Sequence, residues 1–190
     1  MKIVQVMRKT IVIVLGLLLL VVGCSKDSFP RSDTSRETAF SNQLRQVYFQ
    51  LRGEVGDGDH FPSNFVELGS SQLNGALFVC PETGNQPGTM DKIEDWSDFV
   101  YIGNNTEEIP DAPLIISPPE NHDGKYGFVV FVDGVVSQLP APQVRNLVKE
   151  PWLLITNTPE ANIAYMKKRV TVFVPKKFKS LYPDAYNSSR

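Results

Sequence analysis

The first 24 residues limit most strongly how this 190-residue chain is built. A short start with three basic residues leads into the apolar run 10–22, which ends at Gly23-Cys24. A run of about 13 residues is too short to cross a bilayer as a helix, which needs roughly 20. The basic start and short apolar run are typical of a signal peptide, and the Gly-Cys pair indicates the lipoprotein type. We therefore predict a signal peptide over residues 1–23; the alternatives are an ordinary cleaved signal and a weak membrane helix.

Cys24 is the predicted lipid attachment site. Signal peptidase of the lipoprotein type cuts between Gly23 and Cys24, and the thiol then takes a diacylglycerol. Two or three buried acyl chains, at about 0.8 kcal/mol per CH₂, hold a folded domain on a membrane almost irreversibly. Ser25, in place of an aspartate after the cysteine, favours sorting to an outer membrane in a cell that has one. We expect a lipid-anchored protein of the cell envelope that metabolic labelling with palmitate detects.

The composition of the mature chain suits one acidic domain. Cleavage removes three positive charges and leaves 16 Lys and Arg against 21 Asp and Glu, a net charge of −5. This balance argues against a nucleic-acid partner. Residues 25–35 are polar and include a proline, as in a tether. We expect lipidated cysteine and tether over 24–35, a globular domain over 36–155, and a C-terminal extension, 156–190, packed on the same domain.

Basic residues gather late in the chain. They form Lys167-Lys168-Arg169 and, further on, Lys176-Lys177 with Lys179. They stand beside strand-like residues and make no long basic tract. We interpret them as a solvated face or as edge-strand protection, with surface binding as the alternative.

Cysteine and histidine usage points away from metal and disulfide sites. With Cys24 lipidated, Cys80 has no partner for an intramolecular disulfide, and it ends an apolar segment, where a buried inert thiol is the commonest state. His60 and His122 stand alone and far apart, so no zinc spacing is present. A thiol and imidazole pair of Cys80 with His122 is the enzymatic alternative, and structure is the favoured role.

Periodicity predicts one long helix followed by short strands. Apolar residues recur at helical spacing over residues 35–52, so we expect an amphipathic helix that lies against a sheet. Further helices are expected over 142–149 and 159–168. The expected strands follow glycine and proline punctuation: 76–80, 98–102, 113–117, 126–132, 135–139, 152–156 and 169–174. Asp133-Gly134 predicts a two-residue hairpin turn in which both positions accept positive φ. The fold class is α+β.

Seven segments, grouped in five motifs, resemble a known family. Residues 41–51 with 56–62 are similar to N-N-L-K-Q-I-x-x-A-L…Y-x-x-D-N-x-x-F-P of prepilin-like proteins related to the pseudopilins of type II secretion. Residues 77–81 resemble their L-x-C-P, 99–103 their Y-x-Y-x-G, and 110–114 their P-D-x-P-L. Asn121-His122-Asp123-Gly124, followed by 130–136, is similar to N-H-G-G…V-L-F-x-D-G-H-V, the His…Asp-Gly signature of the group.

The resemblance covers about residues 40–155 and implies a type IV pilin-like fold, with the N-terminal helix laid across an antiparallel sheet. Those proteins begin with a processed apolar helix of the F-T-L-I-E-L-L kind that supports filament assembly, and here the lipoprotein signal replaces it. We therefore expect a monomer or a small oligomer. Val135 stands where relatives carry a histidine after Asp-Gly, which argues against a histidine-based site.

Carboxylates offer the remaining candidate ligands. Asp111, Glu120, Asp123 and Asp133 supply hard oxygen atoms, and the resemblance brings in calcium because pseudopilins of type II secretion bind it as a group. The spacing matches no EF-hand, and aspartate before glycine nucleates turns by bonding its own backbone. We favour the turn role and no cofactor; a structural calcium ion is the alternative. His122 is interpreted as an imidazole that bonds backbone in a loop, rather than as a ligand or proton donor.

No nucleophile elbow, P-loop or dinucleotide fingerprint occurs in the sequence. Trp96 and Trp152 stand among hydrophobic residues, so we expect them in the core or covering the sheet. The expected function is therefore non-enzymatic: a structural or interaction component of a secretion or surface-filament apparatus, with envelope or secretion-system proteins as partners. The alternative is a lipid-anchored module that binds a glycan, peptide or cation on a pilin-like scaffold, and a hydrolase-type enzyme ranks last.

Overall fold

The computed structural model describes residues 33–55, 60–64, 67, 73–154 and 159–188, and the account below concerns them. The predicted signal peptide, Gly23, Cys24 and most of the tether lie outside the described residues. Residues 37–190 form one compact unit. Among the helices that are described, none is both long and apolar enough to span a membrane.

A five-stranded antiparallel sheet organises this unit. Its order is β4-β3-β2-β1-β5, with β1 Val100–Gly103, β2 Pro113–Ser117, β3 Tyr126–Phe131, β4 Val136–Pro140 and β5 Thr171–Phe173. The central strand β2 is buried along its whole length. Neighbouring strands pair antiparallel, and one register irregularity falls between Pro113 and Ile115. The α+β class is therefore confirmed.

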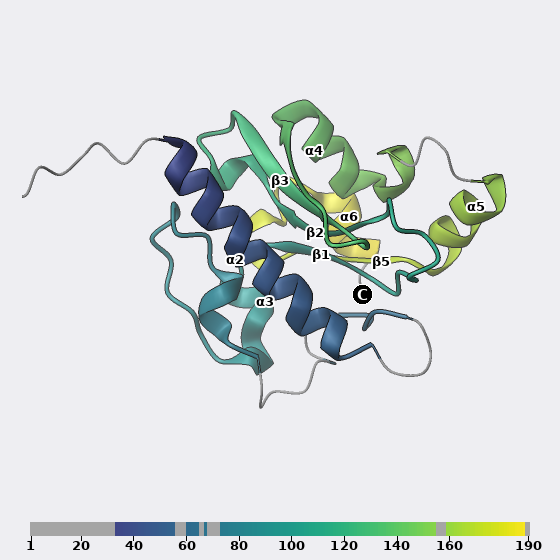
Figure 1. The fold of residues 1–190 in the computed structure, drawn as a ribbon, viewed down its shortest axis with the longest axis horizontal. Helices are drawn as coiled ribbons and strands as arrows, with labels where there is room; N and C mark the ends of the chain where they lie inside the picture. The colour runs from purple at the N-terminus through teal and green to yellow at the C-terminus, as the bar shows by residue number, and fades with distance from the viewer. Residues whose placement is uncertain (1–32, 56–59, 65–66, 68–72, 155–158, 189–190) are drawn as a thin grey trace, which may run out of the picture. The chain divides into compact units, whose positions relative to one another are not determined.

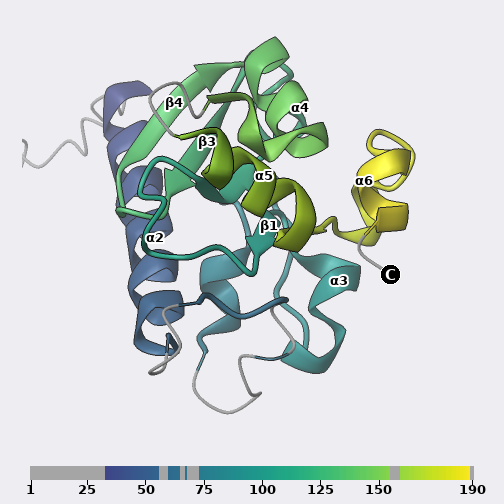
Figure 2. The same cartoon turned by 90° about the vertical axis from the view of Figure 1, so that its right-hand side faces the viewer.

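Helices cover both faces of the sheet. In Figures 1 and 2, α2 (Asp33–Gly53) crosses one face, whereas α4 (Ala141–Lys149) and α6 (Pro183–Ser188) lie on the other. The remaining helical elements are α3 Ile93–Trp96, α5 Glu160–Arg169, and the 3₁₀ helices η2 Gly75–Phe78, η3 Met90–Lys92, η4 Pro119–Asn121, η5 Pro151–Leu154 and η6 Lys176–Phe178.

The long helix matches its prediction closely, since α2 differs from the expected 35–52 by only a few terminal residues. Its apolar stripe, spaced three and four residues apart, is buried against the first face of the sheet: Phe40, Leu44, Val47 and Leu51. Phe49 points the other way and is 67% exposed. The stripe is therefore occupied by the domain's own core.

The second face of the sheet has its own core, because successive strand residues point to opposite sides. Val100, Ile102 and Ile116 project there. The residues that cover them come from α4 and from the C-terminal segment: Val144, Leu147, Val148, Phe178, Tyr182 and Ala185. Since β5 also pairs with β1, residues near the C-terminus complete the sheet and its second layer.

The hairpin between β3 and β4 forms where predicted, but its turn differs. Phe131 N donates to Val135 O and Gly134 N donates to Phe131 O, so the loop has three residues, 132–134. Gly134 has φ +83°, while Asp133 keeps a negative φ. The Asp133 carboxylate accepts a hydrogen bond from Val135 N at 2.8 Å. The prediction of a two-residue turn with two positive φ values is therefore wrong, because a type I turn followed by a left-handed glycine closes the same strands.

Two predicted strands are wrong. Residues 75–78 form a 3₁₀ helix, because the Asn74 side chain accepts a hydrogen bond from Ala76 N and so starts a turn. Residues 151–154 form another, which follows α4 and begins at Pro151, where the missing N–H costs nothing. Residues 155–156 of the second prediction lie outside the described part of the chain. Helices 142–149 and 159–168 and strand 169–174 are confirmed within about two residues.

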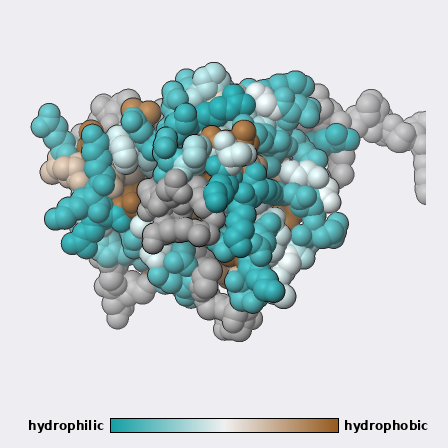
Figure 3. Space-filling view, turned by 180° about the vertical axis from the view of Figure 1, so that it is seen from behind, coloured by the Kyte–Doolittle hydropathy of each residue, from teal (hydrophilic) through white to brown (hydrophobic). Residues whose placement is uncertain are grey.

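The surface away from α2 is mainly hydrophilic. In Figure 3 the hydrophobic residues on this side are scattered and form no continuous patch. Leu181, 49% exposed, is one of the few large apolar side chains that reach solvent among the described residues.

Candidate functional site

The densest polar cluster surrounds the Cys80 loop, by which we mean residues 80–85. Asp98, two residues before β1, is completely buried, and its carboxylate points into this loop. Oδ2 accepts hydrogen bonds from Cys80 N at 2.7 Å and Thr83 Oγ1 at 2.6 Å, and Oδ1 accepts one from Asn85 Nδ2 at 2.7 Å. A buried carboxylate needs such donors to offset its lost hydration.

Lys177 supplies the charge partner of Asp98. It lies in η6, and its Nζ forms an ion pair with Oδ1 of the carboxylate while its side chain is 27% exposed. Burial lowers the pKa of the Lys177 ammonium to about 8, and a smaller charge interaction with Cys80 acts in the opposite direction. Lys177 is an exposed residue, as predicted, but its Nζ also reaches the buried Asp98 carboxylate, which the sequence did not predict.

His122 forms a second polar cluster next to the first. Its ring follows η4 and is fully buried. Nε2 lies 2.9 Å from Ser117 Oγ, and Nδ1 lies 2.9 Å from Glu82 Oε2 of the Cys80 loop. Asn121 Nδ2 donates to both Ser117 Oγ and Asp98 O, so it joins the two clusters. The prediction that His122 bonds backbone is wrong, because its ring nitrogens bond side chains.

Aromatic rings enclose the imidazole on several sides. Tyr126 stacks on it with ring centroids 5.1 Å apart, and Phe40 and Phe128 each approach to 5.2 Å at steep angles. Phe40 comes from α2 and the other two from β3. The ring is therefore locked between the helix and the sheet.

The order Ser117–His122–Glu82 is that of a catalytic triad, in which serine attacks an acyl carbon and the imidazole takes its proton. Asn121 Nδ2 donates to Ser117 Oγ, so the serine hydroxyl can donate its own proton to His122 Nε2. In a neutral imidazole the ring proton then lies on Nδ1, which faces Glu82. Ser117 is 0% exposed, however, and His122 is buried as well. Of the three residues, only Glu82, with a side chain 34% exposed, meets solvent. An acyl substrate cannot reach Oγ in this arrangement, so the contacts fasten the Cys80 loop to the sheet.

Cys80 is not paired with His122, since both ring nitrogens are occupied by other side chains. The Cys80 thiol is completely buried and free. Burial raises its pKa to about 11, which suppresses the thiolate at neutral pH. The predicted inert, packed thiol agrees with this environment.

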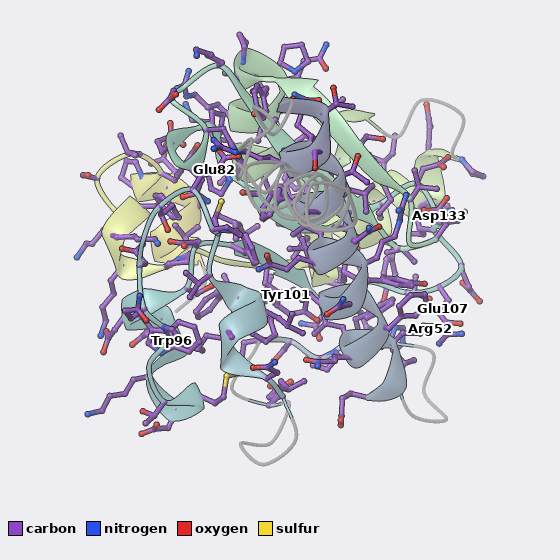
Figure 4. All side chains as sticks on the ribbon, turned by 60° about the vertical axis from the view of Figure 1, so that its left-hand side comes forward. Arg52, Glu82, Trp96, Tyr101, Glu107 and Asp133 are labelled. Atoms are coloured by element: carbon purple, nitrogen blue, oxygen red, sulfur yellow. The ribbon has the colours of Figure 1, made fainter. Side chains whose placement is uncertain are left out.

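The four candidate calcium ligands lie in separate contacts. Glu120 bonds Arg145 and Tyr182, Asp123 faces Lys125, and Asp133 caps its own turn. Asp111 is exposed. In Figure 4, Asp133 also lies on the opposite side of α2 from Glu82, the carboxylate of the His122 cluster. Within the described residues no three His, Cys, Asp or Glu side chains converge as a metal site.

The other aromatic candidates are engaged by neighbours. The Trp96 indole N–H donates to Thr89 O at 3.0 Å, and Lys167 Nζ lies 5.4 Å from the Trp152 ring centroid. His60 stacks on Tyr165, whose other neighbour is Arg169. Both tryptophans are partly buried and pack against the core, as predicted.

Asp98, Lys177, Glu82 and Ser117 were not predicted from the sequence. The residues that they contact lie up to 79 positions away in the sequence, and no regular sequence spacing connects the contacting pairs. The only available signal was the presence of a polar residue next to an apolar strand: Asp98 lies two residues before β1, and Ser117 is the last residue of β2.

Comparison with protein-family models gives no match to this chain, and neither a curated protein nor a solved structure matches it.

Proposed function

We propose that this chain is a lipid-anchored envelope protein whose pilin-like domain serves as a structural or interaction component of a secretion or surface-filament apparatus. The observation that carries the proposal is the Gly23-Cys24 pair at the end of a short apolar run. The unit that follows has a sheet whose two faces are both covered by residues of the same chain. A lipid anchor joined to a domain with a complete core is suited to hold that domain at a membrane surface.

The pilin-like part of the proposal is supported by a long N-terminal helix on an antiparallel sheet. The domain adds β5 beyond β1 and packs η6 and α6 on the sheet's second face. Both additions come from the C-terminal residues. A fold of this class hosts many functions. The proposed role therefore rests on the predicted lipid anchor together with the buried Ser117–His122–Glu82 series, which a substrate cannot reach.

A non-enzymatic role is the better proposal because the hydrogen-bonded series Ser117–His122–Glu82 is closed to substrate. The buried Cys80 thiol is likewise protonated at neutral pH. Neither group offers an accessible nucleophile beside a base, which is what acyl transfer requires.

A ligand-binding module on the same scaffold is the second candidate. The observation that favours it is a surface hollow lined by Lys176, Lys179, Ser180 and Pro183. Lys176 is already paired with Glu94 and Asp95, however, which reduces the positive charge available to an anionic ligand.

Lipid attachment is tested by comparing two cysteine variants. Cys24→Ser should abolish palmitate labelling and leave the uncleaved precursor, whereas Cys80→Ser should be labelled and cleaved like the parent. Flotation of separated membranes then locates the parent, with the outer membrane as the expected fraction in a cell that has two. A parent protein without label would overturn the anchor.

The partner class is tested by photo-crosslinking in cells. A photoreactive residue in place of the exposed Phe49 on α2 should give adducts with envelope proteins, and the same residue in place of Arg45, on the same helix, is the control. Adducts confined to small ligands, or none at either position, would favour the binding module over the assembly role.

A further inference from the structure

Asp98 and Lys177 form an ion pair in which the carboxylate is completely buried. The carboxylate is 0% exposed, and the lysine Nζ contacts its Oδ1 directly. The two residues are 79 positions apart in sequence. Asp98 precedes β1, and Lys177 stands in the C-terminal segment that covers the second face of the sheet. A bond here would tie that segment to the sheet.

The surroundings of the carboxylate resemble those that stabilise an acyl-transfer intermediate. Three donors converge on its oxygens: Cys80 N, Thr83 Oγ1 and Asn85 Nδ2, at 2.6 to 2.7 Å. Donors fixed around a carboxyl carbon stabilise the oxyanion that forms when a nucleophile attacks it. They also favour the ionised carboxylate before attack, so the proton required for the reaction has to come from the lysine.

The environment of the lysine favours release of that proton. Burial lowers the pKa of Lys177 to about 8. The adjacent Lys176 differs, since hydrogen bonds to Asp95 and then Glu94 raise its pKa and keep it charged. A desolvated neutral amine is the form that acts as a nucleophile.

We propose that Lys177 and Asp98 condense into an intramolecular amide bond. One ammonium proton passes from Nζ to the carboxyl oxygen that it contacts, and the neutral amine attacks Cγ. The second proton moves from nitrogen to the same oxygen as the Cγ–O bond breaks, and one water molecule leaves. A carboxylate and an ammonium become an amide and water, so atoms and charge balance without an oxidant or other co-reactant.

The bond would take the place of a disulfide in a chain whose only described cysteine is free. It closes a loop of roughly 80 residues, and closing a long loop stabilises a fold mainly by restricting the unfolded chain. Unlike a disulfide, an amide resists reductants. The C-terminal segment would therefore stay fixed over the second core under conditions that break other crosslinks.

The test is peptide mapping of the full-length protein purified from membranes. Trypsin should release residues 93–125 joined to residues 177–179, with a mass one water below the sum of the two peptides. Fragmentation should place the link on Asp98 and Lys177. Recovery of residues 93–125 at their unmodified mass, together with cleavage after Lys177, would overturn the proposal.

Three variants separate this bond from other water losses, such as cyclisation at Asp-Gly. Lys177→Arg keeps the charge but removes the nucleophile, so the linked peptide should disappear. Asp98→Asn should still form the bond, now with loss of ammonia. Lys176→Arg, the matched control, should leave the link intact. A mass deficit that persists in Lys177→Arg would assign the water loss elsewhere and overturn the bond.

Discussion

At the scale of single residues, Asp98 is the position on which the polar cluster depends. Removing its side-chain carboxyl group takes away the partner of Lys177 and the acceptor that three other donors share. Asp98→Ala should therefore lower the free energy of unfolding by about 3–5 kcal/mol. Asp95→Ala is the control, because Asp95 pairs with Lys176 at the exposed surface and should cost less than about 1 kcal/mol. Urea denaturation measures both, and equal small losses would mean that the cluster contributes little.

Cys80 should make stability depend on alkaline pH. An unfolded cysteine loses its proton near pH 9.0, whereas burial keeps the folded thiol protonated up to about pH 11. Between these values the folded state binds more protons, so the free energy of unfolding falls as pH rises, by up to about 2–3 kcal/mol. Burial also raises the pKa of Tyr101 and Tyr182, which act in the same direction.

The Cys80 contribution is isolated by comparison with Cys80→Ala, since both tyrosines remain in that variant. The difference in free energy of unfolding between parent and variant should be constant below about pH 9 and should shrink above it. A difference that does not change with pH would contradict a buried thiol. Equilibrium denaturation at a series of pH values provides the measurement.

At the scale of elements, the β3–β4 turn shows how one glycine is used. A Cβ at Gly134 would lie 2.8 Å from Tyr48 Cε1 of α2, and the residue has φ +83°. Gly134→Ala should therefore cost about 1–3 kcal/mol, from backbone strain and displacement of the Tyr48 ring. Gly84→Ala is the matched control: φ is +67° there, but nothing lies within 4 Å of the added Cβ. Thermal unfolding should show the larger loss for Gly134→Ala.

Elements with a strong local pattern could be predicted from the sequence. The apolar stripe of α2, the uninterrupted apolar run of β3 and the position of the turn after it, though not its type, depend on residues close in sequence. Segments 75–78 and 151–154 were misassigned because a single residue, Asn74 or Pro151, starts a 3₁₀ turn within an apolar run that reads equally well as a strand.

The polar clusters could not be predicted in the same way. Asp98 meets Lys177 only because β1 and the C-terminal segment lie together in the folded unit, and His122 meets Glu82 only because the Cys80 loop folds over η4. These contacts follow from the tertiary arrangement and leave no periodic trace. The two residues that sequence did single out, Cys80 and His122, lie in the region of these clusters but do not pair.

At the scale of the whole molecule, the two cores explain why the domain should remain alone in solution. One face of the sheet is covered by the apolar stripe of α2 and the other by α4 and the C-terminal segment. Subunits of the family that the sequence resembles polymerise through an additional exposed apolar helix, and here the predicted lipoprotein signal stands in its place. The surface seen in Figure 3 offers no continuous apolar patch in its place.

We therefore expect the protein that begins at Ser25, with Cys80 kept reduced, to sediment as a monomer at micromolar concentration and to form no filaments in negative-stain micrographs. Calcium should change its melting temperature little, because Asp133 and Glu120 already bond protein groups and no three candidate ligands converge among the described residues. A ligand that binds the folded state at a hundred times its Kd would add about 2.7 kcal/mol and raise that temperature by several degrees. Regular fibres, or a calcium shift of that size, would instead indicate an assembling, calcium-stabilised pseudopilin.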